Sequence, residues 1–426
     1  MLGPSRILGL GGAYGGVAEG IDGATSNVAA PAVRATYSGL HVDYDLTASI
    51  TFPGSFSSTD FENRGSLPRG SANASDFVYG NAGALVQVGP FGAALTLDAT
   101  SYTLESPNQN TINFRLLRAH AIVAWAFLKY QLVVGVGIQG VTMNLASSAI
   151  PLAPPSGVGP EAGVLLKLDD QPWRLGVTAR APVSGGVSGD QTALSGKILP
   201  SSVVAPGEIE IGFALQLGPR PLNPRWIDPS GELAPLREKV EAARDARKKT
   251  DDAEVAKLPA GAPREALQRK LEARERAIRR VEDQRLDTEE KRIREEHDAR
   301  FANWPRPRLL VVADALITAP VSNAVAVSSF LDQTNESYGA SWTVSPRLGL
   351  EGEPFPDRFR LRFGSYLEPS LFDGGSARQH FTFGGDLKLF TWDFFGILER
   401  TTWQLSAAAD LAPRYSNWGL SLGVWH

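Results

Sequence analysis

The sequence predicts an all-β protein, a transmembrane antiparallel β-barrel of about fourteen strands with an N-terminal hatch and an inserted α-helical hairpin. Three observations predict this fold class. Apolar and polar residues alternate in segment after segment from about residue 35 to the end, long and short connections alternate between these segments, and aromatic residues gather at their ends. Successive side chains of a strand point to opposite faces, so each segment has one apolar and one polar side. This combination is typical of bacterial outer-membrane barrels, which are apolar outside and polar inside.

The alternation is clearest at residues 208-217. The apolar face carries Ile209, Ile211, Phe213, Leu215 and Leu217, and the other face carries Glu208, Glu210, Gly212, Ala214 and Gln216. Further alternating segments lie at 173-177, 359-363, 381-389 and 403-407. We expect strands near 37-50, 78-89, 91-104, 111-127, 131-145, 160-169, 172-183, 208-218, 307-318, 339-350, 358-368, 379-390, 401-411 and 415-425. An even number of strands agrees with the architecture of single-chain bacterial barrels.

Composition excludes several functional classes. The chain of 426 residues has no cysteine, which excludes thiol nucleophiles, disulfides and cysteine-based metal sites. A net charge of −4 does not indicate nucleic acid as a partner. The five histidines show no metal-ligand spacing, and no S-x-x-K motif occurs. We therefore predict no enzyme, no metal and no cofactor.

The first nine residues lack the basic region and sustained apolar core of a signal peptide. An exported barrel needs one, so we expect the numbering to start at a misplaced start codon or at the beginning of a trimmed form. No window contains the roughly 18 consecutive apolar residues of a membrane-spanning helix. Membrane association is therefore expected to involve the strands or the surface.

Composition changes sharply between Pro219 and Pro307, where charged residues of both signs dominate. Glu→Arg pairs four residues apart recur, an orientation that supports a helix. The segment 259-263 contains two prolines and a glycine and divides the region into two arms. A thin apolar stripe includes Leu271, Ile278 and Val281, which we predict as partner-docking residues. The sequence thus divides into a hatch at 1-34, barrel strands at 35-218, a helical hairpin at 219-306 and barrel strands at 307-426.

Connection lengths predict which side the hairpin occupies. The tight turns near 89-90, 129-130, 169-171 and 353-357 are expected to face the periplasm, and the longer loops are expected to face outward. If the first strand runs outward, the eighth strand runs inward and ends near Gly218. Strand parity therefore predicts a periplasmic hairpin, and a strand count wrong by one would reverse this prediction.

The segment 10-32 resembles the N-terminal hatch of the FadL-type outer-membrane transporters of long-chain fatty acids and aromatic hydrocarbons. In that family a Gly/Ala-rich stretch leads through an Asp-Ala-Ser/Thr-Ser-Asn-like stretch to an Asn-Pro-Ala corner. The residues that match by type are Asp22, Ala24, Thr25, Ser26, Asn27, Pro31 and Ala32, and the predicted hatch also includes Gly12 and Tyr14. Ala30 replaces the usual Asn, and Gly23 stands where a second Asp is common.

The resemblance implies passive uptake of hydrophobic small molecules such as fatty acids across the bacterial outer membrane. In the family, ligand is captured near the outer loops and leaves sideways through a strand irregularity after the hatch moves. Here the outer loops 51-77, 184-207 and 319-338 carry the apolar residues Phe52, Phe56, Ile198, Leu199, Val203, Val204, Val321, Val325 and Phe330.

Charged residues predicted to face the lumen are candidates for binding a carboxylate. They are Arg358, Arg360, Arg362, Glu208, Glu210, Arg174 and Arg180, and the row Arg358, Arg360 and Arg362 is where we expect an acid head group. An alternative remains open, in which these charges pair with one another and with the hatch.

A second functional hypothesis is structural. A charged helical arm with a thin apolar stripe suits docking onto a protein, so the chain could anchor an envelope complex through residues 231-303. The predicted partners are therefore the lipid bilayer, hydrophobic small molecules and a periplasmic protein.

Overall fold

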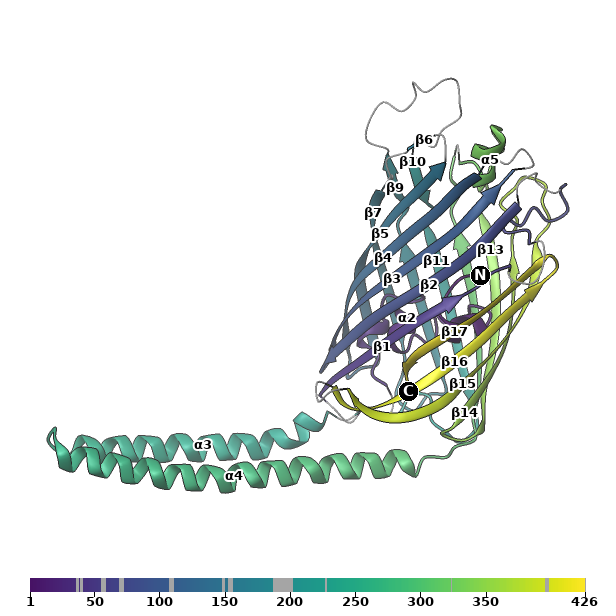
Figure 1. Cartoon of the computed structure of the whole chain (residues 1–426). Helices are drawn as coiled ribbons and strands as arrows, with labels where there is room; N and C mark the ends of the chain where they lie inside the picture. The colour runs from purple at the N-terminus through teal and green to yellow at the C-terminus, as the bar shows by residue number, and fades with distance from the viewer. Residues whose placement is uncertain are drawn as a thin grey trace. The chain divides into compact units, whose positions relative to one another are not determined.

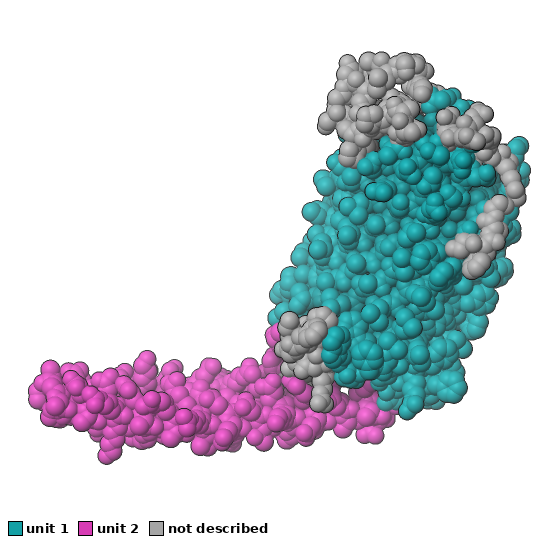
Figure 2. Space-filling view, viewed as in Figure 1, with its two compact units in different colours: residues 1–36, 43–225, 305–426 teal, residues 37–42, 226–304 magenta. Residues whose placement is uncertain are grey.

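The structure of the chain is a computed structural model. It describes residues 1-35, 38, 41-54, 59-68, 73-106, 111-147, 150-151, 156-186, 202-226, 228-322, 324-394 and 398-425. The chain forms two compact units. Unit 1 comprises residues 1-36, 43-225 and 305-426, and unit 2 comprises residues 37-42 and 226-304 (Figure 2).

Unit 1 contains a closed antiparallel β-barrel (Figure 1). In the described residues its wall has fourteen strands: β1 (Val42–Thr51), β2 (Asn73–Val88), β3 (Phe91–Glu105), β4 (Thr111–Phe127), β5 (Leu132–Ser147), β7 (Ser156–Leu166), β8 (Trp173–Arg180), β11 (Glu208–Leu217), β12 (Leu309–Thr318), β13 (Thr343–Phe355), β14 (Phe359–Glu368), β15 (Arg378–Phe394), β16 (Leu398–Ala412) and β17 (Tyr415–Val424). Pairing of β1 with β17 closes the ring, with Thr47 opposite Gly423. The ring satisfies the backbone polar groups of all its strands without leaving an open edge.

The two faces of the wall differ as the alternation predicts. On β11, Ile209, Ile211 and Phe213 are more than 40% exposed on the outer face. Glu210 and Gln216, on the inner face of the same strand, are each 4% exposed. The outer surface of the barrel is therefore apolar and the inner surface carries most of its polar side chains.

Four short elements lie beside the wall strands. β6 (Ile150–Pro151) pairs with the end of β5, and β9 (Val183–Gly186) pairs with β10 (Ser202–Ala205) in a separate two-stranded sheet. A short helix, α5 (Val327–Asp332), lies in the connection between β12 and β13. All four belong to connections at the end of the barrel that carries the longer loops.

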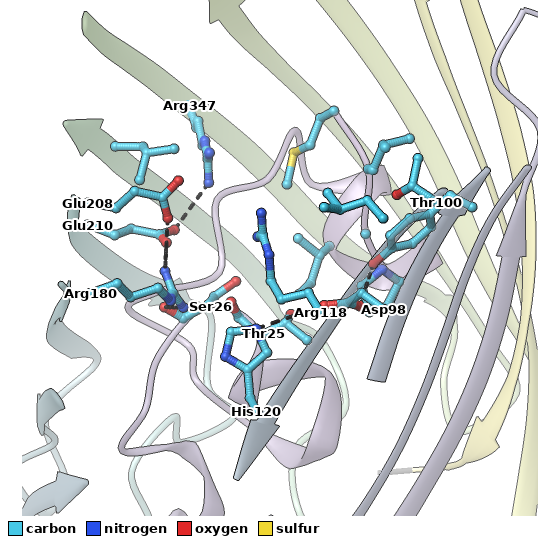
Figure 3. A pocket seen from close by; sticks show the side chains of 18 residues that line it. Thr25, Ser26, Asp98, Thr100, Arg118, His120, Arg180, Glu208, Glu210 and Arg347 are labelled. Carbon is cyan, nitrogen blue, oxygen red and sulfur yellow. Dashed lines mark hydrogen bonds and ion pairs between the residues drawn. The ribbon is translucent and has the colours of Figure 1, made fainter. Parts of the chain in front are cut away.

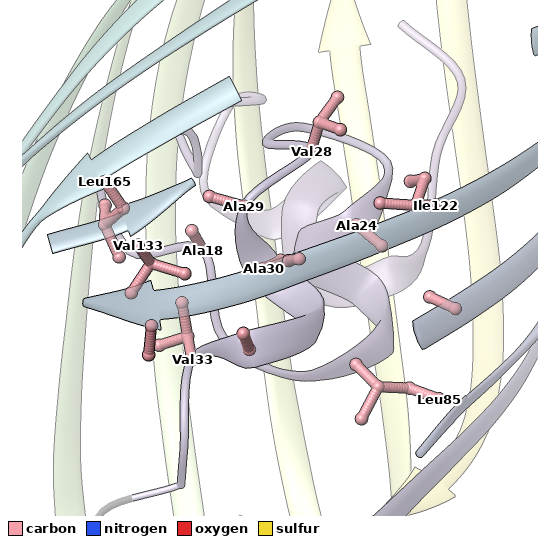
Figure 4. Packing of buried hydrophobic residues seen from close by; sticks show 14 of the residues in the cluster. Ala18, Ala24, Val28, Ala29, Ala30, Val33, Leu85, Ile122, Val133 and Leu165 are labelled. Carbon is pink, nitrogen blue, oxygen red and sulfur yellow. The ribbon is translucent and has the colours of Figure 1, made fainter. Parts of the chain in front are cut away.

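The N-terminal segment fills part of the barrel interior and forms the hatch. It contains the helices α1 (Ser5–Gly9) and α2 (Gly20–Ala24) and the 3-10 helix η1 (Ala30–Ala32). Figure 4 shows its small side chains packed against the inner wall. This cluster combines Ala18, Ala24, Val28, Ala29, Ala30 and Val33 of the hatch with Leu85, Ile122, Val133 and Leu165 of the wall. Two wall glycines permit the close approach, because a Cβ at Gly92 or Gly135 would lie within about 2 Å of a hatch carbonyl oxygen.

Unit 2 is dominated by two long helices, α3 (Pro229–Ala256) and α4 (Ala262–Ala302). Ion pairs join the two arms, including Arg244 Nε to Glu282 at 2.9 Å and Arg247 Nε to Glu275 at 2.9 Å. Leu271 and Ile293 of α4 are buried, Ile278 is half-buried, and Val281 is 65% exposed. No helix in the described residues is both long enough and apolar enough to cross a membrane.

The predicted fold class is confirmed, including the hatch and the helical hairpin. The chain leaves the barrel after Leu217 and re-enters it at Leu309, and these two residues are paired in the sheet. This end of β11 and β12 is also the end with the short turn between β2 and β3 at Gly89 and Pro90. The predicted side of the membrane for residues 219-306 stays a prediction.

Phe213→Arg is expected to impair barrel folding, because Phe213 is 41% exposed on the outer face near the middle of β11. An arginine facing lipid near the midplane costs about 2–4 kcal/mol. The measurement is the folded fraction against urea during refolding into lipid vesicles. Phe213→Leu is the control, since it keeps an apolar side chain; equal losses for both variants would contradict a lipid-facing position.

Candidate functional site

The inner wall is apolar near the longer loops. A cluster that we call the mouth cluster contains buried Leu104, Ile112, Phe114, Val141, Met143, Leu145, Val183 and Leu331, with Tyr102, Leu116, Val327 and Phe330 packed against it. Tyr102 stacks on Phe114 with ring centroids 4.5 Å apart, and Phe77 lies 4.9 Å from Tyr102. Inward-facing aromatic and aliphatic residues are unusual in a lumen that is otherwise polar. The mouth cluster therefore offers an apolar surface inside the barrel.

The inner face of β4 changes from apolar to charged along a single strand. Ile112, Phe114 and Leu116 belong to the mouth cluster, and the next two residues on that face are Arg118 and His120. This order follows directly from the two-residue period of the strand. An amphiphilic molecule in the lumen would thus meet an apolar surface first and charges next.

A cavity of about 250 Å³ lies at this change of polarity. Figure 3 shows the side chains around it. The labelled residues come from the hatch (Thr25, Ser26), β3 (Asp98, Thr100), β4 (Arg118, His120), β8 (Arg180), β11 (Glu208, Glu210) and β13 (Arg347). Leu116 belongs both to the cavity lining and to the mouth cluster, so the two regions are continuous.

Arg118 differs in its interactions from the other arginines that line this cavity. In the described part of the chain it has no hydrogen-bond or ion-pair partner, and its Nε is buried. The side chain extends from β4 into the cavity (Figure 3). Arg118 is half-buried, and an anionic ligand would give its guanidinium a charged partner.

The other charges around the cavity have partners. Arg180 NH1 lies 3.7 Å from both Glu208 and Glu210, and its NH2 donates to the Thr25 carbonyl at 2.7 Å. Arg347 NH1 lies 3.2 Å from Glu210 Oε1. The structure thus brings three predicted lumen residues, Arg180, Glu208 and Glu210, together at the cavity and pairs them with one another.

Asp98 and His120 are engaged as well. Asp98 accepts hydrogen bonds from the Tyr79 hydroxyl at 2.7 Å and from Asn81 Nδ2 at 2.6 Å. His120 Nδ1 lies 3.1 Å from both carboxylate oxygens of Glu161. The described residues contain no group of His, Asp and Glu side chains that would hold a metal ion.

The remaining predicted lumen residues lie outside the cavity lining. Arg362 is fully buried between Glu351, 2.7 Å from its Nε, and Asp386. Arg360 lies 3.8 Å from Glu353 and 3.9 Å from Asp386, whereas Arg358 is exposed in the turn between β13 and β14. A head group at this row would compete with carboxylates of the wall. A ligand-binding role for these residues stays a prediction.

Arg174 contacts the hatch. Its NH1 donates to Glu19 Oε1 at 2.8 Å and to the Val17 carbonyl at 2.9 Å, and its Nε donates to Asn223 at 2.6 Å. The side chain is fully buried. Arg174 thus ties the hatch to the wall, while its predicted contact with a ligand stays a prediction.

The predicted hatch residues form hydrogen bonds within the hatch or between the hatch and the barrel wall. The amide groups of Tyr14 and Gly15 donate to Asp314 Oδ2 at 2.7 and 2.6 Å. Asn27 bridges within the hatch, donating to the Gly15 carbonyl at 2.9 Å. Further contacts involve the Gly12 carbonyl with Arg347, the Ser26 carbonyl with Arg180, the Pro31 carbonyl with Gln87, and the Asp22 carbonyl with the Thr25 hydroxyl.

The predicted outer-loop residues are partly within the described residues. Phe330 packs against the mouth cluster, and Phe52 lies 4.8 Å from the Trp418 ring. Val321 and Val325 lie in the described connection before α5. Val203 and Val204 contribute backbone pairing to β10, and Phe56, Ile198 and Leu199 lie outside the described residues.

Sequence reasoning missed Arg118 as a site residue, although a signal was present. The alternation at 111-127 puts Arg118 on the same face as Phe114 and Leu116, so an arginine follows a purely apolar face. The pattern does not show that Arg118 lacks a partner, because this depends on strands and hatch residues that are far away in sequence.

The fold matches solved structures over nearly the whole chain. A Pseudomonas aeruginosa FadL homologue aligns with a TM-score of 0.53 at 10% identity, covering 99% of this chain and 97% of its own. The CymD monoaromatic hydrocarbon channel aligns with a TM-score of 0.50 at 10% identity, covering 99% and 96%. The chain has the FadL-type barrel fold. The resemblance of its N-terminal segment to FadL-type transporters thus extends to the whole architecture.

No protein-family model matches the sequence, and a search of the curated proteins finds no match. The FadL-type fold at such low identity leaves the ligand and the path to be argued from the residues of this chain. The mouth cluster and the cavity at Arg118 are the features of the lumen on which that argument rests.

Arg362→Leu is expected to destabilise the FadL-type barrel by about 3–5 kcal/mol, because Glu351 and Asp386 lose the guanidinium that lies between them. The measurement is the urea midpoint of the folded barrel, followed by its heat-modifiable migration. Arg358→Leu makes the same substitution at an exposed turn position and should leave the midpoint nearly unchanged. Similar midpoints for the two variants would show that the buried pairing contributes little.

Proposed function

We propose that the chain is an outer-membrane channel for passive uptake of hydrophobic small molecules that carry an acid group, such as fatty acids. The observation that carries this proposal is the unpaired Arg118 directly beneath the mouth cluster. The apolar cluster suits the hydrocarbon part of a ligand, and the guanidinium suits a carboxylate, with which it forms charge-assisted hydrogen bonds. The FadL-type fold supports a channel rather than an enzyme.

The proposed path begins at the loops. A ligand leaves water by packing against Tyr102, Phe114 and Leu116, which removes its apolar surface from solvent. Its head group then reaches Arg118 in the cavity. The hatch, which lines the same cavity through Thr25 and Ser26, blocks further movement until it is displaced. No covalent chemistry and no cofactor are needed for these steps.

An acid fits this lumen better than a neutral hydrocarbon does. CymD is a monoaromatic hydrocarbon channel, and a neutral ligand of that kind would leave the Arg118 guanidinium without a partner. Two of the carboxylates at the cavity, Glu208 and Glu210, are already paired with Arg180. They therefore do not compete strongly for Arg118. Asp98, which lies opposite Arg118 in the pairing of β3 and β4, accepts hydrogen bonds from Tyr79 and Asn81.

The anchor hypothesis remains a second proposal, in which the hairpin is expected in the periplasm from strand parity. The exposed Val281 favours it, because most of the stripe residues are covered within the hairpin whereas Val281 is 65% exposed. Deleting residues 226-304 in cells should leave acid uptake intact if the chain is a channel. Crosslinking from Val281→Cys should capture a second protein if the chain is an anchor, and products confined to this chain would argue against an anchor.

Arg118→Gln should weaken binding of a long-chain fatty acid by tenfold or more, since a hydrogen bond to a charged group contributes about 1.5–3 kcal/mol. Binding of the corresponding fatty alcohol should not weaken, because the alcohol does not need the positive charge. Both affinities are measured on the purified barrel by fluorescence competition.

Arg115→Gln is the matched control for this experiment. Arg115 lies on the same strand but is exposed on the opposite face. It should leave both affinities unchanged. Equal effects of the two variants, or equal loss of acid and alcohol binding in Arg118→Gln, would contradict a head-group role for Arg118.

A further inference from the structure

The two helices of unit 2 contact each other along one line on each helix (Figure 1). Buried and half-buried residues recur there at intervals of three or four positions. We call these residues the contact line. They are Leu233, Leu236, Val240, Arg244, Arg247, Asp251 and Val255 on α3 and Leu267, Leu271, Glu275, Ile278, Glu282, Leu286, Glu289 and Ile293 on α4.

The contact line separates two faces of the hairpin. An α-helix turns by roughly 100° per residue, so the residue before a contact-line residue and the residue after it lie on opposite sides of the line. Because the arms are antiparallel, they are related by a two-fold axis perpendicular to the plane of the two helices. This axis keeps the preceding residues of both arms on one face and the following residues of both arms on the other face.

The face formed by the preceding residues, which we call the basic face, carries mostly positive charges. Its basic residues are Lys239, Lys270, Arg274, Arg285 and Arg292, and its acidic residues are Glu232 and Glu254. We call the face formed by the following residues the acidic face. Its acidic residues are Glu241, Asp245, Asp252, Glu272, Asp283, Asp287 and Glu290, and its basic residues are Arg237, Lys248, Arg276, Arg279 and Arg294.

The cations of the basic face are only partly neutralised by the hairpin itself. Arg274 NH2 lies 2.6 Å from Asp251, and Arg292 pairs with Glu289. The side chains of Lys239, Lys270 and Arg285 are exposed and form no hydrogen bond or ion pair within the described residues. The basic face therefore has free cations that an acidic partner would neutralise.

The acidic face is compensated more fully. Arg279 Nε lies 3.0 Å from Glu275, and Arg244 NH2 lies 2.6 Å from Asp283. Glu290 lies within 4 Å of two arginines, Arg237 at 3.8 Å and Arg294 at 3.9 Å. The two faces thus differ both in the sign of their charges and in how many of these charges have a partner inside the hairpin.

The uncharged residues of the basic face are short. Val281 is its largest aliphatic side chain on α4 and is 65% exposed, and Ala246, Ala266 and Ala277 are exposed as well. Short side chains let the backbone of another helix come close, since the distance between packed helices, about 8–10 Å, depends on the side chains at the contact. From Ala266 to Arg292 the basic face spans roughly 40 Å at 1.5 Å per residue. It has the length and the surface for a third helix.

A lipid surface fits this face less well than a helix does. Helices that lie in a membrane interface insert Trp, Phe or Leu, and the basic face has none of these on either arm. A second copy of the hairpin fits less well too. Two basic faces repel each other, and a basic face on an acidic face is a head-to-tail contact that does not close into a dimer.

We propose that the basic face of the hairpin binds an acidic amphipathic helix of another protein. The partner helix carries short apolar residues on one side, which cover Val281 and the alanines, and Asp or Glu along both edges, which pair with Lys239, Lys270 and Arg285. This inference rests on the anchor hypothesis and deepens it by naming the chemistry of the partner.

The test uses two synthetic helical peptides as probes. Both have alanine and leucine on one side, and the edges carry glutamate in one peptide and lysine in the other. Their affinity for the purified full chain is measured by fluorescence anisotropy at low salt. The glutamate peptide should bind and should weaken as salt is added, whereas the lysine peptide should not bind.

Lys270→Glu combined with Arg285→Glu should weaken binding of the glutamate peptide by about tenfold or more, because two attractive charges become repulsive. Lys248→Glu combined with Arg276→Glu is the matched control. It makes the same change in net charge at exposed positions of the acidic face and should leave the affinity nearly unchanged. Circular dichroism verifies that both double variants keep their helices.

Equal weakening by the two double variants, or equal binding of the two peptides, would overturn the proposal. A photocrosslinker attached at Val281→Cys, in vesicles that contain phosphatidylglycerol, tests the lipid surface. Adducts with lipid that the glutamate peptide does not displace would also overturn it.

Failure of the anchor hypothesis gives a different result. If Val281→Cys captures no second protein in cells while the glutamate peptide still distinguishes the two double variants, the anchor is rejected and the chemistry of the basic face stands. If a protein is captured but charge reversal on the basic face does not reduce its capture or peptide binding, the anchor stands and this inference is rejected.

Discussion

The structure depends on one constraint, which is that a ring of fourteen strands encloses more space than the side chains of its own wall can fill. The hatch occupies part of that space, and its contacts with the wall are polar as well as apolar. Glu19 pairs with Arg174, Asp314 accepts two amide groups of the hatch, and Arg6 lies 3.5 Å from Glu351. Because Arg174 and Asp314 are buried in the wall, their contacts with the hatch help to satisfy them. The hatch therefore belongs to the interior of the barrel as much as the inward-facing side chains do.

The same constraint explains where a ligand would fit. Beside the hatch, the inner wall carries apolar residues that pack on the hatch as well as paired charges such as Arg174. Toward the longer loops, the inner wall turns apolar and forms the mouth cluster. Arg118 lies at the boundary between these regions and has no partner in the described residues. The proposed path thus offers an apolar surface followed by a guanidinium, an arrangement that suits an amphiphilic acid.

The period of the strands made most of this fold predictable. Side chains alternate with period two whatever their partners are, so 208-217 and 111-127 show their strands in the sequence alone. The pairing of the charges could not be predicted in the same way. Arg362 meets Glu351 because β13 and β14 have a particular register, and Arg174 meets Glu19 because the hatch follows a particular path. A single sequence shows which residues share a face of a strand, but it does not show the register of the strands or the path of the hatch. The sequence therefore could not show which arginines are paired and which arginine lacks a partner.

The hairpin is not required by the barrel, because Leu217 and Leu309 are paired as they would be across a short turn. Its own stability is modest, since ion pairs between exposed arms contribute little individually and its buried apolar residues are few. At the base of α3, Trp226 donates to the Ser38 carbonyl, and the N-cap residue Asp228 contacts His41. Unit 2 therefore combines the two long helices with described residues of the connection between the hatch and β1.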